Sequence, residues 1–244
     1  MTRIIIGAVG AFTVLFLTVF GLAPRLFSVS YDSAAIATKA AEVAKQEKVA
    51  AESVPDTRPT VEHVPLPPQV KAIYMTSCVA GTPNFRQKLL TVMQETEINA
   101  VVVDIKDFSG TISFAPTDPA LLPAWENARC GARDMRELLQ MLHDNKVYVI
   151  GRITVFQDPF YAERHPELAV KRADGVTVWR DGKGLAFIDV AAHDYWDYII
   201  KLSTDSYNLG FDELNFDYVR YPSDGNMVDI SFTHSIASEY KGDK

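Results

Sequence analysis

From residue 70 onward, apolar residues follow two different spacings along the chain, and these spacings separate strands from helices. Short runs rich in β-branched and aromatic residues predict strands, whereas apolar positions three or four residues apart predict helices. The predicted strands are VKAIYMTS (70–77), AVVVDIKD (100–107), VYVIGRITVF (147–156) and FDELNFDYVRYP (211–222). The predicted helices are residues 84–97, 133–145 and 193–209. Strands that alternate with helices predict a parallel sheet built from βαβ units.

Two architectures fit this order of elements: an open doubly wound sheet, or part of a (β/α)₈ barrel. The run AVVVDIKD is almost continuously apolar, as expected for a strand that is covered on both faces. The loop after the first strand lacks G-x-G-x-x-G, and no G-x-x-x-x-G-K-[ST] occurs in the sequence. The motifs therefore give no support to nucleotide binding.

The N-terminal part has a different pattern. Residues 4–24 carry no charge over 21 positions, which is long enough for a helix to cross a membrane. We therefore expect residues 1–27 to form a single-pass membrane anchor with the rest of the chain outside the cytoplasm. The alternative is a cleaved signal peptide, which would make the protein secreted; the run is longer than usual for that class, and no clear Ala-x-Ala site follows it.

Residues 28–69 predict a connection between the anchor and a folded domain. Their first part, up to about residue 52, is rich in Ala, Lys and Glu and favours a solvated helical stalk. Five prolines between residues 55 and 68 then predict a semi-rigid extended spacer. The change in composition places the start of the folded domain, residues 70–244, near Val70.

Composition narrows the class of function. The chain has 244 residues, 48% of them hydrophobic, and a net charge of −7, all of it in residues 70–244 because residues 1–69 carry six basic and six acidic groups. This composition excludes a disordered chain and a disulfide scaffold, and an acidic chain is a poor general nucleic-acid binder. The two cysteines, Cys78 and Cys130, could form one disulfide outside the cytoplasm or remain free.

Charged residues gather toward the carboxyl ends of three predicted strands, which is the ligand-binding edge of parallel α/β folds. Asp217 is the first candidate, since a carboxylate there could act as a nucleophile, a proton-transfer group or an electrostatic stabiliser. Its alternative is a structural ion pair with Arg152 or Arg220. Asp104 and Lys106, two residues apart and expected to point the same way, could bind sugar hydroxyls or neutralise each other.

Arg152 follows a glycine and is expected to be buried near the rim, so it needs a carboxylate partner, either Asp104 or Asp217. That makes it an orienting group, and Arg220 is a further candidate for orienting Asp217 and the sugar. Trp179 and Tyr221 are candidate contacts for a sugar ring, because the apolar faces of sugars stack on aromatic side chains. The five histidines are scattered without a zinc-binding motif, so we expect no metal and no other cofactor.

Four segments of the folded part resemble a known family. These segments are DIKDFSGTISF, GRITVFQDPFYAERHPELAVKRADGVTVWRD, GKGLAFIDV and GFDELNFDYVRYPSDG, and the resemblance covers residues 70–244 in unbroken order. The family is a glycoside hydrolase domain formerly catalogued as DUF4015, among the glycosidase-like TIM barrels related to the α-amylase superfamily. The resemblance implies a (β/α)₈ barrel, a carbohydrate polymer as partner, and Asp217 at the strand-four position of a nucleophilic carboxylate.

The length departs from that pattern. Such barrels hold roughly 250 residues, and glycoside hydrolysis requires two carboxyl groups that flank the bond. The chain holds only about the first four β/α units, and the general acid expected from a later strand is missing. We therefore expect a C-terminally incomplete glycoside hydrolase of a cell-envelope or extracellular polysaccharide, inactive alone. The alternative is a non-catalytic glycan-binding or structural module tethered to the membrane. The oligomeric state stays open.

Overall fold

The structure, a computed structural model, describes residues 62–235. It contains a parallel sheet of four strands in the order β1-β2-β3-β4. The strands are β1 (Ala72–Met75), β2 (Ala100–Lys106), β3 (Tyr148–Thr154) and β4 (Glu213–Asp217). The predicted parallel α/β architecture is confirmed. Over the described stretch, no helix combines the length and the apolar character needed to cross a membrane. The predicted anchor, residues 4–24, and the stalk lie outside the described residues.

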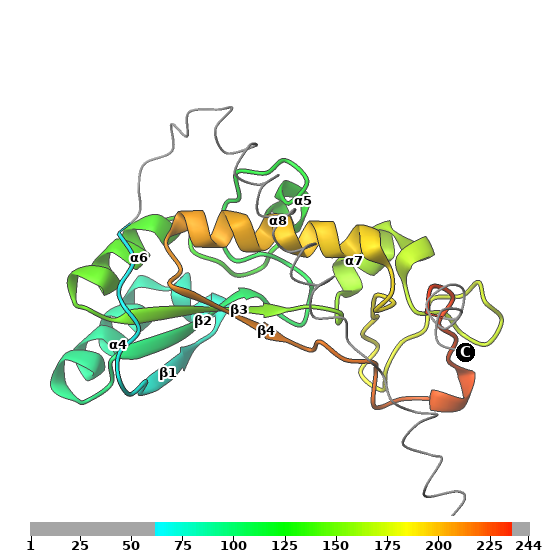
Figure 1. The fold of residues 1–244 in the computed structure, drawn as a ribbon, viewed down its shortest axis with the longest axis horizontal. Coiled ribbons are helices and arrows are strands. Elements are labelled where there is room, and N and C mark those ends of the chain that lie inside the picture. The colour runs from blue at the N-terminus through cyan, green and yellow to red at the C-terminus, as the bar shows by residue number, and fades with distance from the viewer. Residues whose placement is uncertain (1–61, 236–244) are drawn as a thin grey trace, which may run out of the picture. The chain divides into compact units, whose positions relative to one another are not determined.

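Helices connect successive strands, as the sequence pattern predicts (Figure 1). After β1 come α3 (Ser77–Ala80) and α4 (Pro83–Glu95), and after β2 come α5 (Leu122–Glu126) and α6 (Met135–Asp144). The connection from β3 to β4 holds α7 (Pro159–Arg164), the 3₁₀ turn η1 (Pro166–Leu168) and α8 (His193–Leu209). A second 3₁₀ turn, η2 (Met227–Asp229), follows β4.

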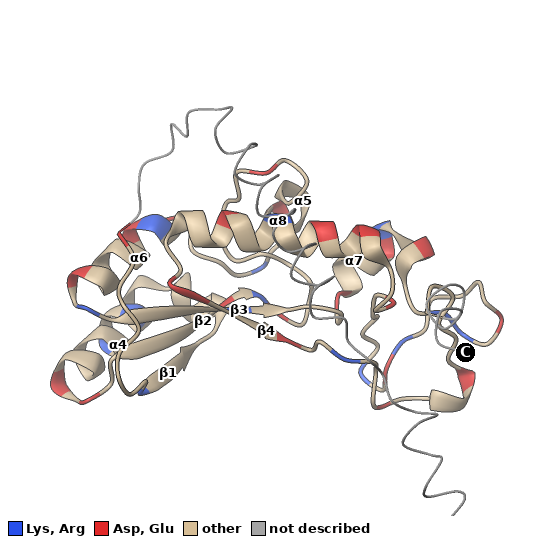
Figure 2. Cartoon of the chain, viewed as in Figure 1, with Lys and Arg blue, Asp and Glu red and all other residues tan. Residues whose placement is uncertain are grey.

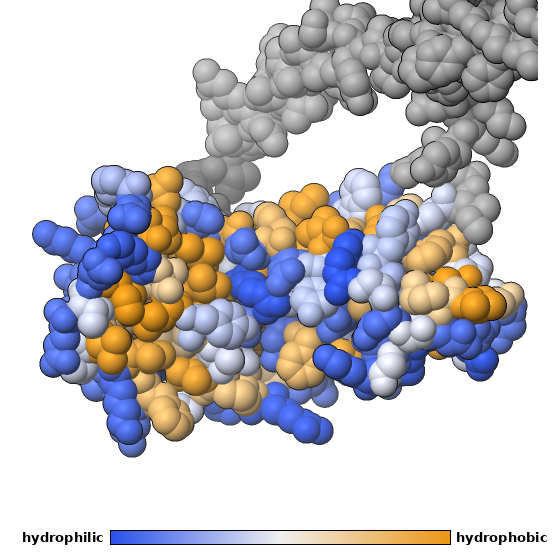
Figure 3. Space-filling model, turned by 90° about the horizontal axis from the view of Figure 1, so that it is seen from below, coloured by the Kyte–Doolittle hydropathy of each residue, from blue (hydrophilic) through white to orange (hydrophobic). Residues whose placement is uncertain are grey.

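The two faces of the sheet have different surroundings. On the helix face, alternate strand residues such as Val101, Val103 and Val149 pack against buried residues of α4, α6 and α8 in one core. On the other face, called the open face below, Ala100 and Ile150 form only a small apolar cluster. Seen from the side opposite α8, apolar residues gather at the end of the molecule that carries α4 and α6 (Figure 3).

The fourth strand is shorter than predicted. It ends at Asp217 and not at Pro222, because Tyr218 adopts a left-handed backbone conformation with φ 54°. A non-glycine residue in this region is strained and turns the chain out of the strand direction. The strand also forms the edge of the described sheet, and Phe216 on its helix face is about half exposed.

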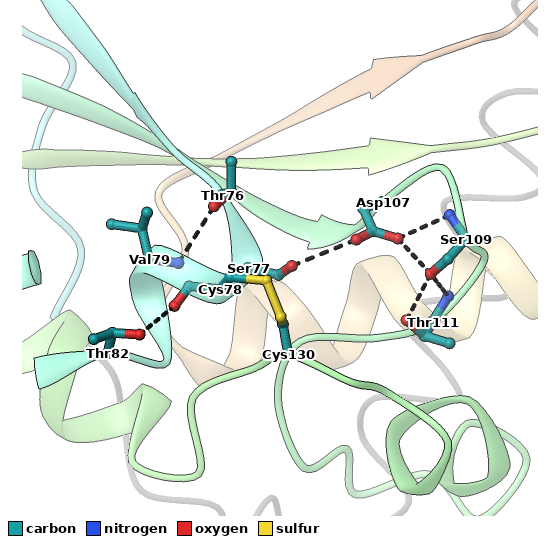
Figure 4. Close-up of a disulfide and its surroundings, with 9 residues drawn as sticks. All are labelled: Thr76, Ser77, Cys78, Val79, Thr82, Asp107, Ser109, Thr111 and Cys130. Atoms are coloured by element: carbon teal, nitrogen blue, oxygen red, sulfur yellow. Dashed lines mark hydrogen bonds between the residues drawn. A yellow bond between two sulfur atoms is a disulfide. The ribbon is translucent and has the colours of Figure 1, made fainter.

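A disulfide joins Cys78 in α3 to Cys130 in the loop before α6, with 4.6 Å between the Cα atoms (Figure 4). The structure thus decides the pairing that the sequence left open. Beside it, Ser77 donates a hydrogen bond to Asp107, which also accepts bonds from the backbone N–H and hydroxyl of Ser109. The disulfide and these bonds fix the loops that follow β1 and β2.

The segment that precedes β1 contacts Asp212, the residue just before β4. The buried carboxylate of Asp212 accepts a hydrogen bond from the backbone N–H of Val64 and lies 3.3 Å from Nδ1 of His63 and 3.1 Å from Nε2 of His143. Burial alone would raise the pKa of Asp212, but the hydrogen bonds from His143 and from the backbone N–H groups of Val149 and Val64 hold it below its ordinary value. His63 and Val64, which the sequence pattern assigned to the spacer, are therefore bonded to the folded domain.

Candidate active site at the carboxyl ends of the strands

Each of the four strands places one polar side chain on the open face near the carboxyl end of the sheet. These residues are Tyr74 of β1, Asp104 of β2, Arg152 of β3 and Asp217 of β4, and we call them the open cluster. The register sets Asp104 beside Arg152 and Thr154 beside Asp217. In parallel α/β proteins this edge is where ligands bind. The structure therefore brings three of the predicted site residues together.

Arg152 is the centre of the open cluster. Its Nε and Nη2 donate to Oδ2 of Asp217 at 2.9 and 2.7 Å, and its Nη1 donates to Oδ1 of Asp104 at 2.8 Å. The guanidinium is mostly buried, and the two carboxylates raise its pKa above the ordinary value although burial opposes them. Arg152 therefore bonds to both of the carboxylates that the sequence analysis named as its candidate partners. The neighbouring Gly151 has no side chain, which leaves room for Ile105 and Phe211 to pack against the strand.

Asp217 is held by both of its carboxylate oxygens yet remains accessible. Oδ1 accepts a hydrogen bond of 2.7 Å from the backbone N–H of Tyr218, Oδ2 faces Arg152, and the side chain is 44% exposed. Burial raises its pKa, but the hydrogen bonds from Arg152 and the Tyr218 N–H outweigh that effect and lower the pKa below its ordinary value. A carboxylate kept ionised in this way suits a nucleophile or an electrostatic stabiliser, and it does not suit a general acid.

Tyr74 is a member of the open cluster that the sequence analysis missed. Its hydroxyl donates to Asp104 and lies 3.5 Å from Nη1 of Arg152, while half of the side chain is exposed. Burial, the hydrogen bond to Asp104 and the negative charge of that residue raise its pKa, so the phenol stays protonated. The sequence carried one signal for this position. Alternation along β1 places Tyr74 on the same face as Ala72, two residues earlier, and Tyr74 is the one nearer the carboxyl end of the strand.

Arg220 and Tyr221 lie beyond β4, next to the open cluster in sequence but on a different surface. The guanidinium of Arg220 lies 4.8 Å from the centre of the Tyr218 ring, and its positive charge also lowers the pKa of Asp217. Both residues line an apolar groove of about 660 Å³ between the end of β4 and α8, with Phe216, Trp196 and Ile200. Figure 2 shows acidic residues recurring along α8, and Arg220 is the one Lys or Arg of the described chain after β4.

Lys106 does not join Asp104, in contrast to the prediction that both point the same way. The pairing of β2 with β3 is irregular between these two residues, and the side chain of Lys106 is completely buried. Its ammonium lies 3.0 Å from Oδ2 of Asp158 and donates to the carbonyls of Thr154 and Val155. A bulge turns a side chain away from the face that strict alternation assigns to it. The position gives Lys106 no surface for a sugar in this structure.

Trp179 is also buried. It packs with Val170 and Phe187 in a small cluster in the long segment between β3 and α8, and its Nε1 donates to the carbonyl of Asn226 at 3.0 Å. The sequence analysis named Trp179 as a contact for sugar, but no face of its ring is exposed in this structure. Within residues 62–235, no group of three or more His, Cys, Asp or Glu side chains is arranged to hold a metal ion.

The fold and the open cluster define an α/β protein with a polar centre at the carboxyl edge of a parallel sheet. Residues 72–243 match the model of the family described as "Putative glycosyl hydrolase domain" (DUF4015), and the chain belongs to this family. No curated protein matches the sequence significantly.

Among solved structures, the chain is similar to a hypothetical protein from Ruminiclostridium thermocellum, with 33% identity and a TM-score of 0.59 over 69% of this chain and 85% of that one. It is also similar to an α-L-fucosidase isoenzyme 2 from Paenibacillus thiaminolyticus, with 13% identity and a TM-score of 0.48. A GH31 α-xylosidase from a soil metagenome gives 13% identity and a TM-score of 0.44. These matches cover 65% and 66% of this chain but only 25% and 24% of the two enzymes.

Proposed function

We propose that this domain carries the nucleophile half of a glycoside hydrolase active site, with Asp217 as the nucleophilic or charge-stabilising carboxylate. The observation that supports this best is the state of Asp217 itself. It lies at the end of β4, accessible to solvent, and it is kept ionised by Arg152 and the Tyr218 N–H. Oxocarbenium-like transition states of glycoside hydrolysis are positively charged and are stabilised by a carboxylate that stays ionised.

In this proposal the other members of the open cluster orient Asp217 and the sugar. Asp104 holds the far side of Arg152, and the half-exposed ring of Tyr74 offers a surface for the apolar face of a sugar. The second carboxyl group, the general acid, comes from additional β/α units that complete a (β/α)₈ barrel. The free edge of β4 and the apolar groove beside it support this completion, because both present surfaces that a further strand and helix would cover.

We further propose that the domain acts on a polysaccharide outside the cytoplasm. The disulfide between Cys78 and Cys130 supports an oxidising compartment, where such bonds persist. The membrane anchor at residues 4–24 stays a prediction from the sequence and would tether the domain to the cell envelope.

The test is Asp217→Asn, with Asp224→Asn as control, because Asp224 is an exposed carboxylate a few residues farther along the chain. Both variants are made in the protein with its complete barrel and assayed on a panel of nitrophenyl glycosides and on cell-envelope polysaccharide. We expect Asp217→Asn to lose at least about a thousandfold in kcat/KM, as for loss of a catalytic group, and the control to keep its activity. Equal activity of Asp217→Asn and the unmodified protein would remove Asp217 from the proposed role.

A non-catalytic glycan-binding module is the second candidate, and one observation favours it. On the open face, Asp104, Asp217 and Glu213 each already bond to a partner, Glu213 to the hydroxyl of Tyr148. Polysaccharide binding in a pull-down assay, without release of reducing ends by the complete barrel, would select this function over hydrolysis.

A further inference from the structure

A second polar cluster lies at the same edge of the sheet as the open cluster but is sealed from solvent. We call Lys106, Asp158 and Tyr195 the sealed cluster; all three side chains are completely buried. Asp158 accepts from the ammonium of Lys106 at 3.0 Å and from the hydroxyl of Tyr195 at 2.8 Å. Its other oxygen accepts from the backbone N–H of Tyr161 at the start of α7. The cluster thus joins β2, α7 and α8.

The sealed cluster is also hydrogen-bonded to the backbone at the end of β3 and just beyond it. Lys106 donates to the carbonyls of Thr154 and Val155, the latter at 3.3 Å. The Tyr195 hydroxyl, whose single proton is shared between Asp158 and this segment, lies 2.7 Å from the carbonyl of Val155. These are main-chain atoms, so the cluster fixes the path of the backbone whatever side chains it carries. No substrate can reach these donors, because Lys106 and Tyr195 are enclosed.

The opposite side of the same segment holds the candidate nucleophile. The N–H of Val155 donates to the carbonyl of Asp217 at 2.8 Å, and the N–H of Phe156 donates to the carbonyl of Tyr218 at 3.3 Å. The backbone from Thr154 to Phe156 is therefore bonded to the sealed cluster through its carbonyls and to β4 through its N–H groups. Any shift of this segment changes the position of the Asp217 main chain.

We propose that Lys106 is a positioning residue for Asp217: its buried ammonium fixes residues 154–156, and these fix the backbone of Asp217 and the left-handed Tyr218. The proposal rests on the proposed function only in taking Asp217 as the nucleophilic or charge-stabilising carboxylate. Its test uses neither a substrate nor catalytic turnover. It replaces the predicted contact of Lys106 with sugar by an action through the β3 backbone.

The energetics of burial support a specific task for the ammonium. Burial lowers the pKa of Lys106, and the carboxylate of Asp158 acts in the opposite direction. An amine enclosed in this way is costly unless nearby acceptors take its hydrogen bonds, as Asp158 and the carbonyls of Thr154 and Val155 do. The enclosure is tight: a Cβ added to Gly110, which has φ +82°, would lie 1.9 Å from Oδ1 of Asp158. The backbone of Gly110 therefore packs directly against the Asp158 carboxylate.

The experiment compares amide hydrogen–deuterium exchange in the full chain with and without the pair, read at single residues by fragmentation mass spectrometry. The test variant is Lys106→Met with Asp158→Asn, which removes both charges together and leaves no unpaired buried ion. The control variant is Asp205→Asn, because Asp205 is a buried carboxylate of α8 bonded to Thr117. The reference amide is Tyr148, which bonds to Asn99 at the other end of the sheet.

We expect the amides of Val155 and Phe156 to exchange about tenfold faster in the double variant than in the control variant. The Tyr148 amide should exchange at the same rate in both variants. Equal acceleration at all three amides would show a purely global loss of stability and would overturn the proposal. Unchanged exchange at Val155 and Phe156 would overturn it as well. Loss of glycoside hydrolysis is not a readout here, so failure of the proposed function is detected separately, by the Asp217→Asn assay.

Discussion

The open and sealed clusters contain the same kind of chemistry in two different environments. Each joins a cationic side chain to carboxylate and phenol groups at the carboxyl edge of the sheet. In the open cluster, Asp217 and Tyr74 reach solvent, whereas in the sealed cluster every member is enclosed. A charge pair in contact with water can exchange a partner for a ligand, and an enclosed pair can only hold what surrounds it. Accessibility therefore separates the candidate site from its framework.

The largest expected effect is on the sealed cluster. Lys106→Met alone leaves Asp158 as an unpaired buried carboxylate, which should cost about 3–5 kcal/mol of unfolding free energy. Adding Asp158→Asn should recover most of that loss, because no buried charge remains. Urea denaturation measures both. The matched control is Arg172→Met at the exposed pair with Asp229, where we expect a much smaller loss because water screens the pair. Comparable losses at the two pairs would contradict the distinction between enclosed and exposed charges.

The disulfide provides an intermediate effect that touches neither cluster directly. Cys78 and Cys130 are separated by 52 residues, so the chain-entropy model gives about 4 kcal/mol for closing this loop. We expect Cys78→Ser with Cys130→Ser to lower the unfolding free energy by about 2–4 kcal/mol while the exchange of the Val155 amide relative to Tyr148 stays the same. A selective change at Val155 would mean that the loop after β2 also positions the strand ends.

The smallest effect is the acid sensitivity of the open cluster. The pKa of Asp217 is lower in the folded state, so its contribution to stability is complete above its unfolded pKa of about 3.9 and is lost as pH falls through the folded value. Stability below about pH 4 should therefore fall more steeply in the unmodified protein than in Asp217→Asn. Because the side chain is 44% exposed, screening limits the difference to roughly 1 kcal/mol or less. Parallel curves for the two proteins in urea melts at pH 6, 4 and 3 would contradict this prediction.

Much of the fold could be predicted from the sequence because strands and helices have different apolar spacings. The runs around β2 and β3 and the helical spacing of α6 and α8 lie where the structure has these elements. The end of β4 could not be predicted, since FDYVRYP continues the strand-like pattern to Pro222. What ends the strand is the backbone conformation of Tyr218, which depends on its bonds to Asp217 and Phe156.

The placement of the candidate site residues could be predicted where alternation along a regular strand holds, and could not where it does not. Asp104, Arg152 and Asp217 share a face because the register of β2, β3 and β4 is regular up to them. Lys106 comes just after the irregularity in the pairing of β2 with β3, so the alternation of side chains along the strand predicted the wrong neighbours for it. Trp179 belongs to a long irregular segment, where no periodicity tells a buried ring from an exposed one. The disulfide depends on spatial proximity that a separation of 52 residues does not fix.

The bonds between Asp212 and the segment before β1 have a practical consequence for where the domain can be cut. A chain shortened to begin at Val70, the boundary that composition suggests, would lose the Val64 N–H and the His63 ring from an enclosed carboxylate. It would also lose the stacking of His63 on Tyr207, whose ring centre lies 4.2 Å away. A soluble version intended for enzymology or crystallisation should therefore keep the residues from about 60 onward, and trimming by sequence composition alone would remove part of what holds β4 in place.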